Sequence, residues 1–500
     1  MTCKILINAL DPEECRIAKV RDGKLEEFHI ERAAHEITRG NIYKGAITRI
    51  EPSLQAVFVD YGAERHGFLQ KHEIHPDYYQ DTGGGEHSVE HLVKKGQELL
   101  LQVVKDPVMK KGAMLTTNLS LAGRYLVLMP GNENRGISRK IEDEEERQRL
   151  KDIIGKLKVP EGFGVIIRTA GAGCTKTLIN RDLSYLMRLW KTIKDNVMKV
   201  STPSLMHKER NLVLRSLRDY FTSEIGEILI DEHGVYREAK DFIHVISPKQ
   251  TKIVKFYKGA KPIFTKFQLE EQIASIYNNR VPLKSGGSIV IEQTEALVSI
   301  DVNSGKATQE KSIEKTALQT NLEAAEEIVR QLRLRDLGGL IVLDFIDMRD
   351  GKNKMEIERA MKQHVKQDKA KTKIGRISQF GLMEMSRQRL RPSIDYGGFE
   401  PCRYCQGKGQ VPSPDMLGLG FLRRLSLETL KPDVSVVKGI VPVPVAEYLL
   451  NRKRKDLLEL ENRHNVTIVI EGSSDMIPGD GEIVKGNGHM AKAGAEGNEA

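Results

Sequence analysis

The sequence has little cysteine, no long apolar run and no strong excess of either charge. Five cysteines among 500 residues are too few for a disulfide framework, which makes a reducing cytosol the default compartment. The longest apolar stretch, Gly339 to Met348, contains two aspartates and falls short of the roughly 18 residues that a membrane span needs. The first six residues lack the basic region and apolar core of a secretory signal. We therefore expect a cytoplasmic protein without a transmembrane segment.

The composition is that of a folded chain with a small basic surplus. Apolar residues make up 39% and charged residues 29%, which excludes a fully disordered chain. The length allows two to five domains, at roughly 100–200 residues each. The net charge of +9 alone hints only weakly at a polyanionic partner. Its distribution is more informative: between Lys352 and Arg391, 12 Lys and Arg oppose 4 Asp and Glu, a local balance of 12 − 4 = +8.

The chain divides into regions of different pattern. Short strands fill the first 33 residues, and a second β-rich region from about 40 to 119, with glycine turns, indicates a small barrel. A mixed helix and strand pattern follows to about 214, and strands reappear between 215 and 280. A smaller module begins after Gly407. The last 30 residues hold seven glycines and predict a frayed tail.

A strand–helix–strand unit lies between residues 289 and 346. Ile289–Glu292 and Ala296–Asp301 predict a hairpin. An amphipathic helix should follow, and the continuously apolar run Leu340–Ile346 predicts a strand buried on both faces. The apolar positions of the helix step by four, three, four and three, at Leu318, Leu322, Ala325, Val329 and Leu332.

Two strands of this unit end in carboxylates. Asp301 closes the first, and Asp344 and Asp347 lie at the end of the second. Ligands of open α/β sheets bind at the carboxyl ends of strands, so these acids should meet at one edge. Alternation along a strand places Asn303 on the same side as Asp301. It also places only one of Asp344 and Asp347 toward Asp301.

A carboxylate pair of this kind predicts a Mg²⁺ site. Two carboxylates a few ångströms apart repel each other unless a cation lies between them, and few oxygen ligands with room for water suit Mg²⁺. Such an ion can polarise a phosphodiester and activate water. Helix-capping or loop-holding aspartates are an equally good interpretation of the spacing alone. The basic run that follows at 352–391 favours a nuclease, which needs cations to hold a phosphate chain.

The barrel region combines aromatic and basic residues, as oligonucleotide-binding folds do. Phe58 and Phe68 are the candidate stacking platforms, with Arg49 and Lys111 among the bases nearby. The alternative is that both phenylalanines belong to the barrel core, which the apolar neighbours of Phe58 slightly favour.

Cys402 and Cys405 form a Cys-x-x-Cys turn followed by glycines, which is typical of half a zinc site. The other three cysteines are isolated, so the two missing ligands would come from a second chain. A redox pair is the alternative, but a surrounding thioredoxin-like pattern is not evident.

Several long strings in this sequence resemble the bacterial ribonuclease E/G family. The resemblance runs from about residue 4 to 415 and is weak beyond it. The strings are RGNIYKGAITRIEPSLQAVFVDYGAERHGFL, KKGAMLTTNLSLAGRYLVLMP, GISRKI, IIRTAG, ALVSIDVNSGKAT, NLEAAEEIVRQLRLRDLGGLIVLDFIDM, FGLMEMSRQRLRPS and CRYC.

The resemblance implies a multidomain α/β endoribonuclease. It would cut single-stranded A/U-rich RNA, prefer a 5′-monophosphate end, and act in rRNA and tRNA processing and in mRNA decay. The implied segments are 1–35 and 215–279 for a split RNase H-like domain, 36–119 for an inserted S1 (OB-fold) barrel, 120–214 for a 5′-sensor region, 280–400 for a DNase I-like catalytic domain, 401–415 for a zinc link and 416–500 for a small oligomerisation domain with a flexible tail.

The resemblance also assigns residues. Asp301 and Asp344 would hold the catalytic Mg²⁺ with Asn303 orienting Asp301, and Asp347 would face away. Phe58, Phe68 and Lys111 would contact RNA. Cys402 and Cys405 would share a structural Zn²⁺ with a second chain, giving a homodimer or homotetramer. The 5′-monophosphate pocket would be formed by Gly123, Val127, Arg139, Arg168, Thr169 and Lys371.

The sequence departs from the family in two respects. Members called E carry a long scaffold tail for degradosome partners, which we expect to be absent from these 500 residues. The chain is therefore either a compact G-like form or part of a longer E-like protein. Lys371 stands where many members have arginine, which weakens a bidentate phosphate contact there. A non-catalytic RNA-binding or ribosome-assembly factor remains the alternative function.

Overall fold

The computed structural model describes residues 3–33, 38–80, 88–107, 112–209, 211–222, 224–305, 313–391, 393–394, 398–431 and 434–486. The chain divides into two units, Met1–Tyr396 and Gly397–Ala500. Each unit has its own hydrophobic core.

The first sheet joins the start of the chain to a segment more than 200 residues later. Its order is β15-β14-β1-β2-β3, with β1 parallel to β14 and antiparallel to β2. Helices α4 and α5 pack against it through a shared apolar core. The bounds are β1 Cys3–Asn8, β2 Glu14–Arg21, β3 Lys24–Arg32, α4 Leu212–Tyr220, β14 Ile225–Ile230, α5 His233–Ile246, β15 Val254–Phe256, α6 Ile263–Lys266 and α7 Glu270–Ser275.

The second sheet closes into a small barrel, as the glycine-punctuated strands predicted. Its order is β13-β4-β5-β6-β8-β7, and β4 also pairs with β7, which closes the ring. The bounds are β4 Ile42–Glu51, β5 Ala56–Asp60, β6 Gly67–Gln70, α1 Val89–Leu92, β7 Glu98–Lys105, β8 Met114–Thr116 and β13 Ser204–His207.

A four-stranded sheet with two helices lies next along the chain. Its order is β11-β12-β10-β9, and the helices contribute Leu150 and Leu183 to its core. The bounds are β9 Leu121–Ala122, β10 Leu126–Pro130, β11 Arg135–Ile137, α2 Glu144–Gly155, β12 Phe163–Ile167 and α3 Lys176–Val197.

The fourth sheet contains the predicted strand–helix–strand unit. Its order is β16-β17-β18-β19-β21-β20, and only the β18–β19 pair is parallel. The hairpin and the amphipathic helix are confirmed as β17, β18 and α8. The bounds are β16 Arg280–Pro282, β17 Ser288–Gln293, β18 Leu297–Asn303, α8 Ile313–Leu334, β19 Gly339–Asp344, α9 Gly351–Val365, β20 Thr372–Ile377 and β21 Leu382–Arg387.

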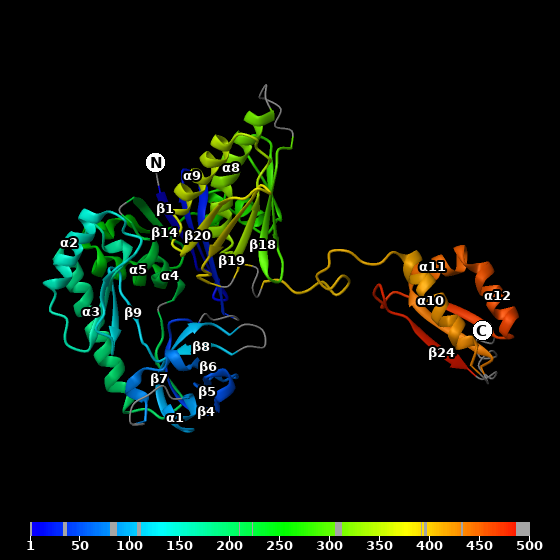
Figure 1. The fold of residues 1–500 in the computed structure, drawn as a ribbon, viewed down its shortest axis with the longest axis horizontal. Helices are drawn as coiled ribbons and strands as arrows, with labels where there is room; N and C mark the ends of the chain where they lie inside the picture. The colour runs from blue at the N-terminus through cyan, green and yellow to red at the C-terminus, as the bar shows by residue number, and fades with distance from the viewer. Residues whose placement is uncertain are drawn as a thin grey trace. The chain divides into compact units, whose positions relative to one another are not determined.

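One face of this sheet is covered and the other is open. Helices α8 and α9 lie side by side along it (Figure 1), and their apolar residues share one core with Ile341 and Leu343 of β19. Leu340, on the opposite face, is 62% exposed. The prediction that β19 is buried on both faces is therefore wrong, because both helices pack on the same side. The open face is free to carry polar side chains.

The second unit is a small α/β module. Its sheet has the order β23-β22-β24, with β22 parallel to β23 and antiparallel to β24. The prediction of a frayed tail is wrong as far as residue 486, since β24 pairs with the central strand. Residues 487–500 lie outside the described part of the chain. The bounds are α10 Pro414–Thr429, β22 Val436–Pro442, α11 Val443–Arg452, α12 Arg454–His464, β23 Thr467–Ser473 and β24 Glu482–Gly486.

Within the described ranges, every helix is too short or too polar to cross a membrane.

Candidate active site and nucleic-acid surfaces

The two strand-end carboxylates are neighbours in the fourth sheet. Asp301 of β18 and Asp344 of β19 are direct partners in the parallel register, and both are exposed on the open face. Asn303 follows two residues after Asp301, and its amide donates a 2.6 Å hydrogen bond to the Asp301 Oδ2 atom. The sequence thus brings two carboxylates and one amide to a single exposed edge.

The pKa of Asp344 is raised above its ordinary value. Partial burial raises the pKa of Asp344, and the negative charges of Asp301 and Asp347 raise it further. The alternation that placed only one of Asp344 and Asp347 toward Asp301 does not apply, because β19 ends at Asp344. A cation placed between the carboxylates would relieve this repulsion.

The loop that carries Asp347 is held by a helix residue that sequence reasoning missed. Asn321 of α8 is fully buried. Its amide donates to the Ile346 carbonyl at 2.9 Å, and its Oδ1 atom accepts from the Ile346 N–H at 3.0 Å. The available signal was a polar residue near the apolar stripe of an amphipathic helix.

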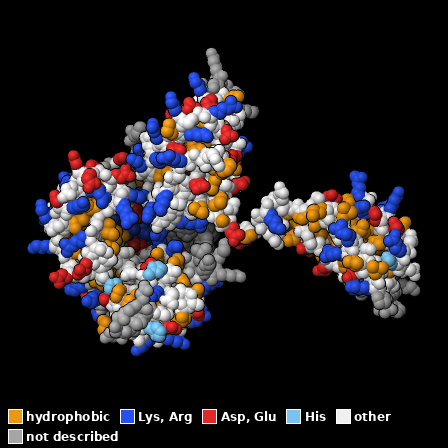
Figure 2. Space-filling view, viewed as in Figure 1, with side chains coloured by type: hydrophobic (Ala, Val, Ile, Leu, Met, Phe, Trp, Pro, Cys, Tyr) orange, Lys and Arg blue, Asp and Glu red, His pale blue; other side chains and the backbone are white. Residues whose placement is uncertain are grey.

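The basic side chains between residues 352 and 391 differ in exposure, and not all of them face solvent. Arg387 is buried, donates to Asp368 at 2.6 Å and to Asp336 at 3.0 Å, and so helps to fix β21. Many of the other bases are exposed, Lys371, Lys373 and Arg376 among them. Figure 2 shows Lys and Arg side chains gathered around a hollow in the face of the larger unit.

In the barrel, the two candidate phenylalanines form one aromatic surface. Phe58 of β5 and Phe68 of β6 are cross-strand partners with ring centroids 5.7 Å apart. The Arg49 guanidinium lies 4.5 Å from the Phe58 ring centroid. Both rings are partly exposed and lie outside the barrel core, so their placement in the core is wrong. Lys111 lies outside the described residues.

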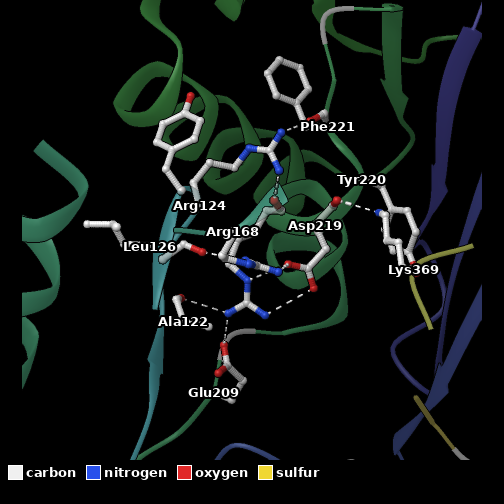
Figure 3. A network of polar contacts seen from close by, with 12 residues as sticks. Ala122, Arg124, Leu126, Arg168, Glu209, Asp219, Tyr220, Phe221 and Lys369 are labelled. Atoms are coloured by element: carbon white, nitrogen blue, oxygen red, sulfur yellow. Dashed lines mark hydrogen bonds and ion pairs between the residues drawn. The ribbon is translucent and has the colours of Figure 1, made fainter. Parts of the chain in front are cut away.

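The candidate 5′-phosphate residues gather around Arg168, at the end of β12. Its Nη1 atom donates to the Gly123 carbonyl at 2.6 Å. Its Nη2 atom donates to the Asp219 carboxylate, also at 2.6 Å (Figure 3). The side chain of Arg168 remains 26% exposed. Arg168 therefore forms a salt bridge with Asp219 while part of its side chain stays accessible to solvent.

The other candidate residues are linked to this region by their own contacts or by those of adjacent residues. Val127 pairs with Ile166 in the strand before Arg168. The Thr169 hydroxyl lies 3.1 Å from that of Ser138, the residue before Arg139. The next residue, Lys140, donates to the Ala370 carbonyl at 2.9 Å, immediately before Lys371. These contacts thus link four segments, around residues 127, 138–140, 166–169 and 370–371.

Cys402 and Cys405 lie in the second unit as free thiols. Cys402 is exposed, and backbone N–H groups of Cys405 and Tyr404 lower the pKa of its thiol. Within the described ranges, no group of three or more His, Cys, Asp or Glu side chains is placed to hold a metal ion. Two thiols on one turn fit half of a tetrahedral zinc site.

Three family models match the chain. The ribonuclease E/G family matches residues 120–390, the S1 RNA binding domain residues 36–117, and the RNase E/G thioredoxin-like domain residues 401–486. The statement that no thioredoxin-like pattern surrounds Cys402 and Cys405 is therefore wrong, since the last match includes both residues. The barrel is therefore an S1 domain, joined to the α/β sheets of the ribonuclease region.

Similar proteins are found in bacteria. Ribonuclease E of Haemophilus influenzae is 48% identical over 95% of this chain and 51% of its own length. Ribonuclease E of Escherichia coli is 47% identical over 92% of this chain and 44% of its own length. Ribonuclease G of Escherichia coli is 36% identical over 92% of this chain and 95% of its own length. The chain spans about half the length of the relatives named Ribonuclease E. It belongs to the ribonuclease E/G family.

Proposed function

We propose that this chain is a Mg²⁺-dependent endoribonuclease that cleaves single-stranded, A/U-rich RNA. It would act in the cytoplasm in rRNA and tRNA processing and in mRNA decay. The observation that carries the proposal is the in-register pair Asp301 and Asp344, with Asn303 bonded to Asp301. The names of the relatives support a ribonuclease.

The donor set at this edge fits Mg²⁺. Two exposed carboxylates and a neighbouring amide supply few oxygen ligands and leave room for water, which this ion retains. Asp301 and Asp344 would hold the ion, and Asn303 would keep the Asp301 carboxylate in place. When bound, Mg²⁺ would stabilise charge on the phosphodiester and activate water, leaving 5′-phosphate and 3′-hydroxyl ends.

The barrel would hold the single strand near this edge. Bases stack on aromatic faces without strict sequence preference, and the partly exposed Phe58 and Phe68 rings offer such faces. Arg49 adds a cation beside them. Lys111 would contribute a phosphate contact.

A preference for 5′-monophosphorylated RNA would arise around Arg168. A guanidinium has five N–H groups, and the contacts with Gly123 and Asp219 use two of them. The other three can face a phosphate dianion, together with the Thr169 hydroxyl. Gly123, Val127, Arg139 and Lys371 would complete the pocket.

Cys402 and Cys405 would bind one Zn²⁺ together with the same pair from a second chain. The structural reason is that the turn supplies two ligands where four are needed. The smallest working unit would then be a dimer, and two dimers could form a tetramer.

The test is cleavage of a 5′-monophosphorylated A/U-rich oligomer by Asp301→Asn and Asp344→Asn. Both changes should abolish Mg²⁺-dependent cleavage and leave RNA binding largely intact. Glu292→Gln is the matched control. Asp301 pairs with Val290 of β17, and Glu292 is an exposed carboxylate two residues further along that strand. Full activity in both asparagine variants would contradict the assignment. A wild type that cuts no RNA under the same conditions would instead favour the alternative, a non-catalytic RNA-binding factor.

A further inference from the structure

We propose that Asp219 is a positioning residue for 5′-phosphate recognition, acting through Arg168. This inference rests on the proposed pocket and adds a residue that lies at the end of helix α4, outside the segments that form the pocket. The sequence gives no hint of it, because Asp219 is 51 positions from Arg168 and belongs to no motif.

Two contacts orient the guanidinium of Arg168. Gly123 and Asp219 accept from the two terminal nitrogens of Arg168, and together with the attachment of the side chain these contacts set the orientation of the group. An unrestrained arginine side chain has several rotatable bonds and loses entropy when it is ordered. With both contacts in place, much of that ordering precedes phosphate binding, which leaves the remaining N–H groups aimed in a defined direction.

Asp219 is itself held in place by other residues. Arg218 donates to both of its carboxylate oxygens, at 3.1 and 3.4 Å, and Lys369 donates to its backbone carbonyl at 2.6 Å (Figure 3). Arg218 is buried, and it also donates to Glu209 at 2.8 Å. The position of Asp219 therefore does not depend on Arg168.

Asp219 is charged in the folded protein. Burial raises the pKa of Asp219, but the guanidinium groups of Arg218 and Arg168 outweigh it, so the net pKa lies well below its usual range. Asp219 remains a carboxylate at neutral pH. A carboxylate beside Arg168 opposes the binding of a phosphate by charge alone. Its benefit to recognition must therefore come from placing the guanidinium.

Arg124 connects the two groups that accept hydrogen bonds from Arg168. Arg124 is buried and donates through both terminal nitrogens to the carbonyls of Arg218 and Phe221. Arg124 directly follows Gly123, the second acceptor of Arg168. The two groups that orient Arg168 are thus fixed to each other through Arg124 and helix α4.

The experiment compares cleavage of one A/U-rich oligomer with either a 5′-monophosphate or a 5′-hydroxyl end. For Asp219→Ala, the ratio of kcat/KM between the two substrates should fall by about tenfold, the size expected for a lost charge-assisted hydrogen bond. Cleavage of the 5′-hydroxyl substrate should not change. Asp219→Asn keeps an acceptor for Arg168 and should restore most of the ratio. Asp241→Ala, an exposed aspartate of α5, is the control.

A second variant covers the case in which Asp219→Ala does not fold. Asp219→Glu retains the charge that balances Arg168 and Arg218 but displaces the carboxylate by one methylene, so the ratio should again fall. A full ratio in Asp219→Glu, or an equal loss on both substrates in any variant, would overturn the positioning role. If the wild type itself shows no preference for the 5′-monophosphate, the proposed pocket fails rather than the role of Asp219 within it.

Discussion

Asp301 and Asp344 are register partners on the parallel pair β18 and β19, so both carboxylates lie on one exposed edge. The raised pKa of Asp344 reflects burial and the nearby negative charges. Holding these negative charges together destabilises the folded chain, and a bound cation would offset this destabilisation.

Mg²⁺ should therefore stabilise the folded chain. We expect the Tm of the wild type to rise with Mg²⁺ concentration and the Tm of Asp344→Asn to be nearly insensitive to it, because one of two ligands is lost. Thermal unfolding at several Mg²⁺ concentrations measures both, with Glu292→Gln expected to behave as the wild type. Equal Mg²⁺ responses in all three proteins would place the ion elsewhere.

Asn321 should be required for both stability and cleavage. Asn321→Leu leaves the N–H and C=O of Ile346 without partners, at a cost of about 1–3 kcal/mol per group. The loop after Asp344 should then loosen and lower kcat. Denaturant unfolding and cleavage assays check these outcomes.

The neighbouring Thr320 provides a matched control. It is equally buried on α8, but its hydroxyl has no hydrogen-bond partner among the described residues. Thr320→Val should be neutral or stabilising. A similar loss in both variants would mean that the helix interior, rather than the loop contact, determines the effect.

Phe58 should contribute to RNA binding by stacking. Phe58→Ala should weaken binding of a single-stranded oligomer by about 1–3 kcal/mol, the usual value for one stacked base. Phe58→Tyr should retain most of the affinity. Fluorescence anisotropy with labelled RNA measures this, and Met198→Ala, an 89% exposed apolar residue at the end of α3, is the control. An alanine variant that binds as tightly as the tyrosine variant would remove stacking at this position.

His29 should make the fold sensitive to mild acid. Burial and the positive charge of Arg391 lower its pKa to about 4, against the opposing carboxylate of Glu27. Between pH 6.5 and about 4 the unfolded chain binds the proton that the folded chain refuses, so stability falls as the pH falls. The slope contributed by one such group is at most about 1.4 kcal/mol per pH unit.

The change His29→Phe isolates this slope. It keeps a ring against Tyr220, whose centroid lies 4.8 Å away, and removes the titration. Urea unfolding between pH 7 and 4 should give a flatter stability profile for this variant, whatever its stability at pH 7. His72→Phe, at a 72% exposed position, should follow the wild type. Parallel profiles for all three proteins would rule out His29 as the source.

Zinc should hold two chains together. The double change Cys402→Ser and Cys405→Ser should remove the metal and halve the molar mass, because the shared site then has no thiolates. Elemental analysis and light scattering measure both quantities, with Cys174→Ser as the control. One Zn²⁺ per two wild-type chains is the expected content. A metal-free wild type with a reversible thiol–disulfide couple would instead support the redox interpretation.

Features that depend on local sequence patterns could be predicted, whereas features that depend on contacts between distant residues could not. The apolar periodicity of α8 is a local pattern and predicted the helix correctly. The acids that end two neighbouring strands predicted the pairing of Asp301 with Asp344. The apolar run of β19 could not reveal that both helices cover the same face. Neither Asp219 nor Asn321 was found, since their roles depend on partners 51 and 25 positions away. The strand β24, which pairs with β22, was missed because a glycine-rich composition also suits turns.

The parallel pairing of β1 with β14 sets an order for synthesis. Ala9 hydrogen-bonds to Asp231, 222 positions later, so the first sheet cannot close until most of the larger unit has been made. The barrel and the β9–β12 region lie entirely between these strands and can complete their own pairings earlier. During translation, the first hairpin must therefore wait with an unpaired edge on β1, which is a site for premature association. Chaperone dependence should be greatest in that interval.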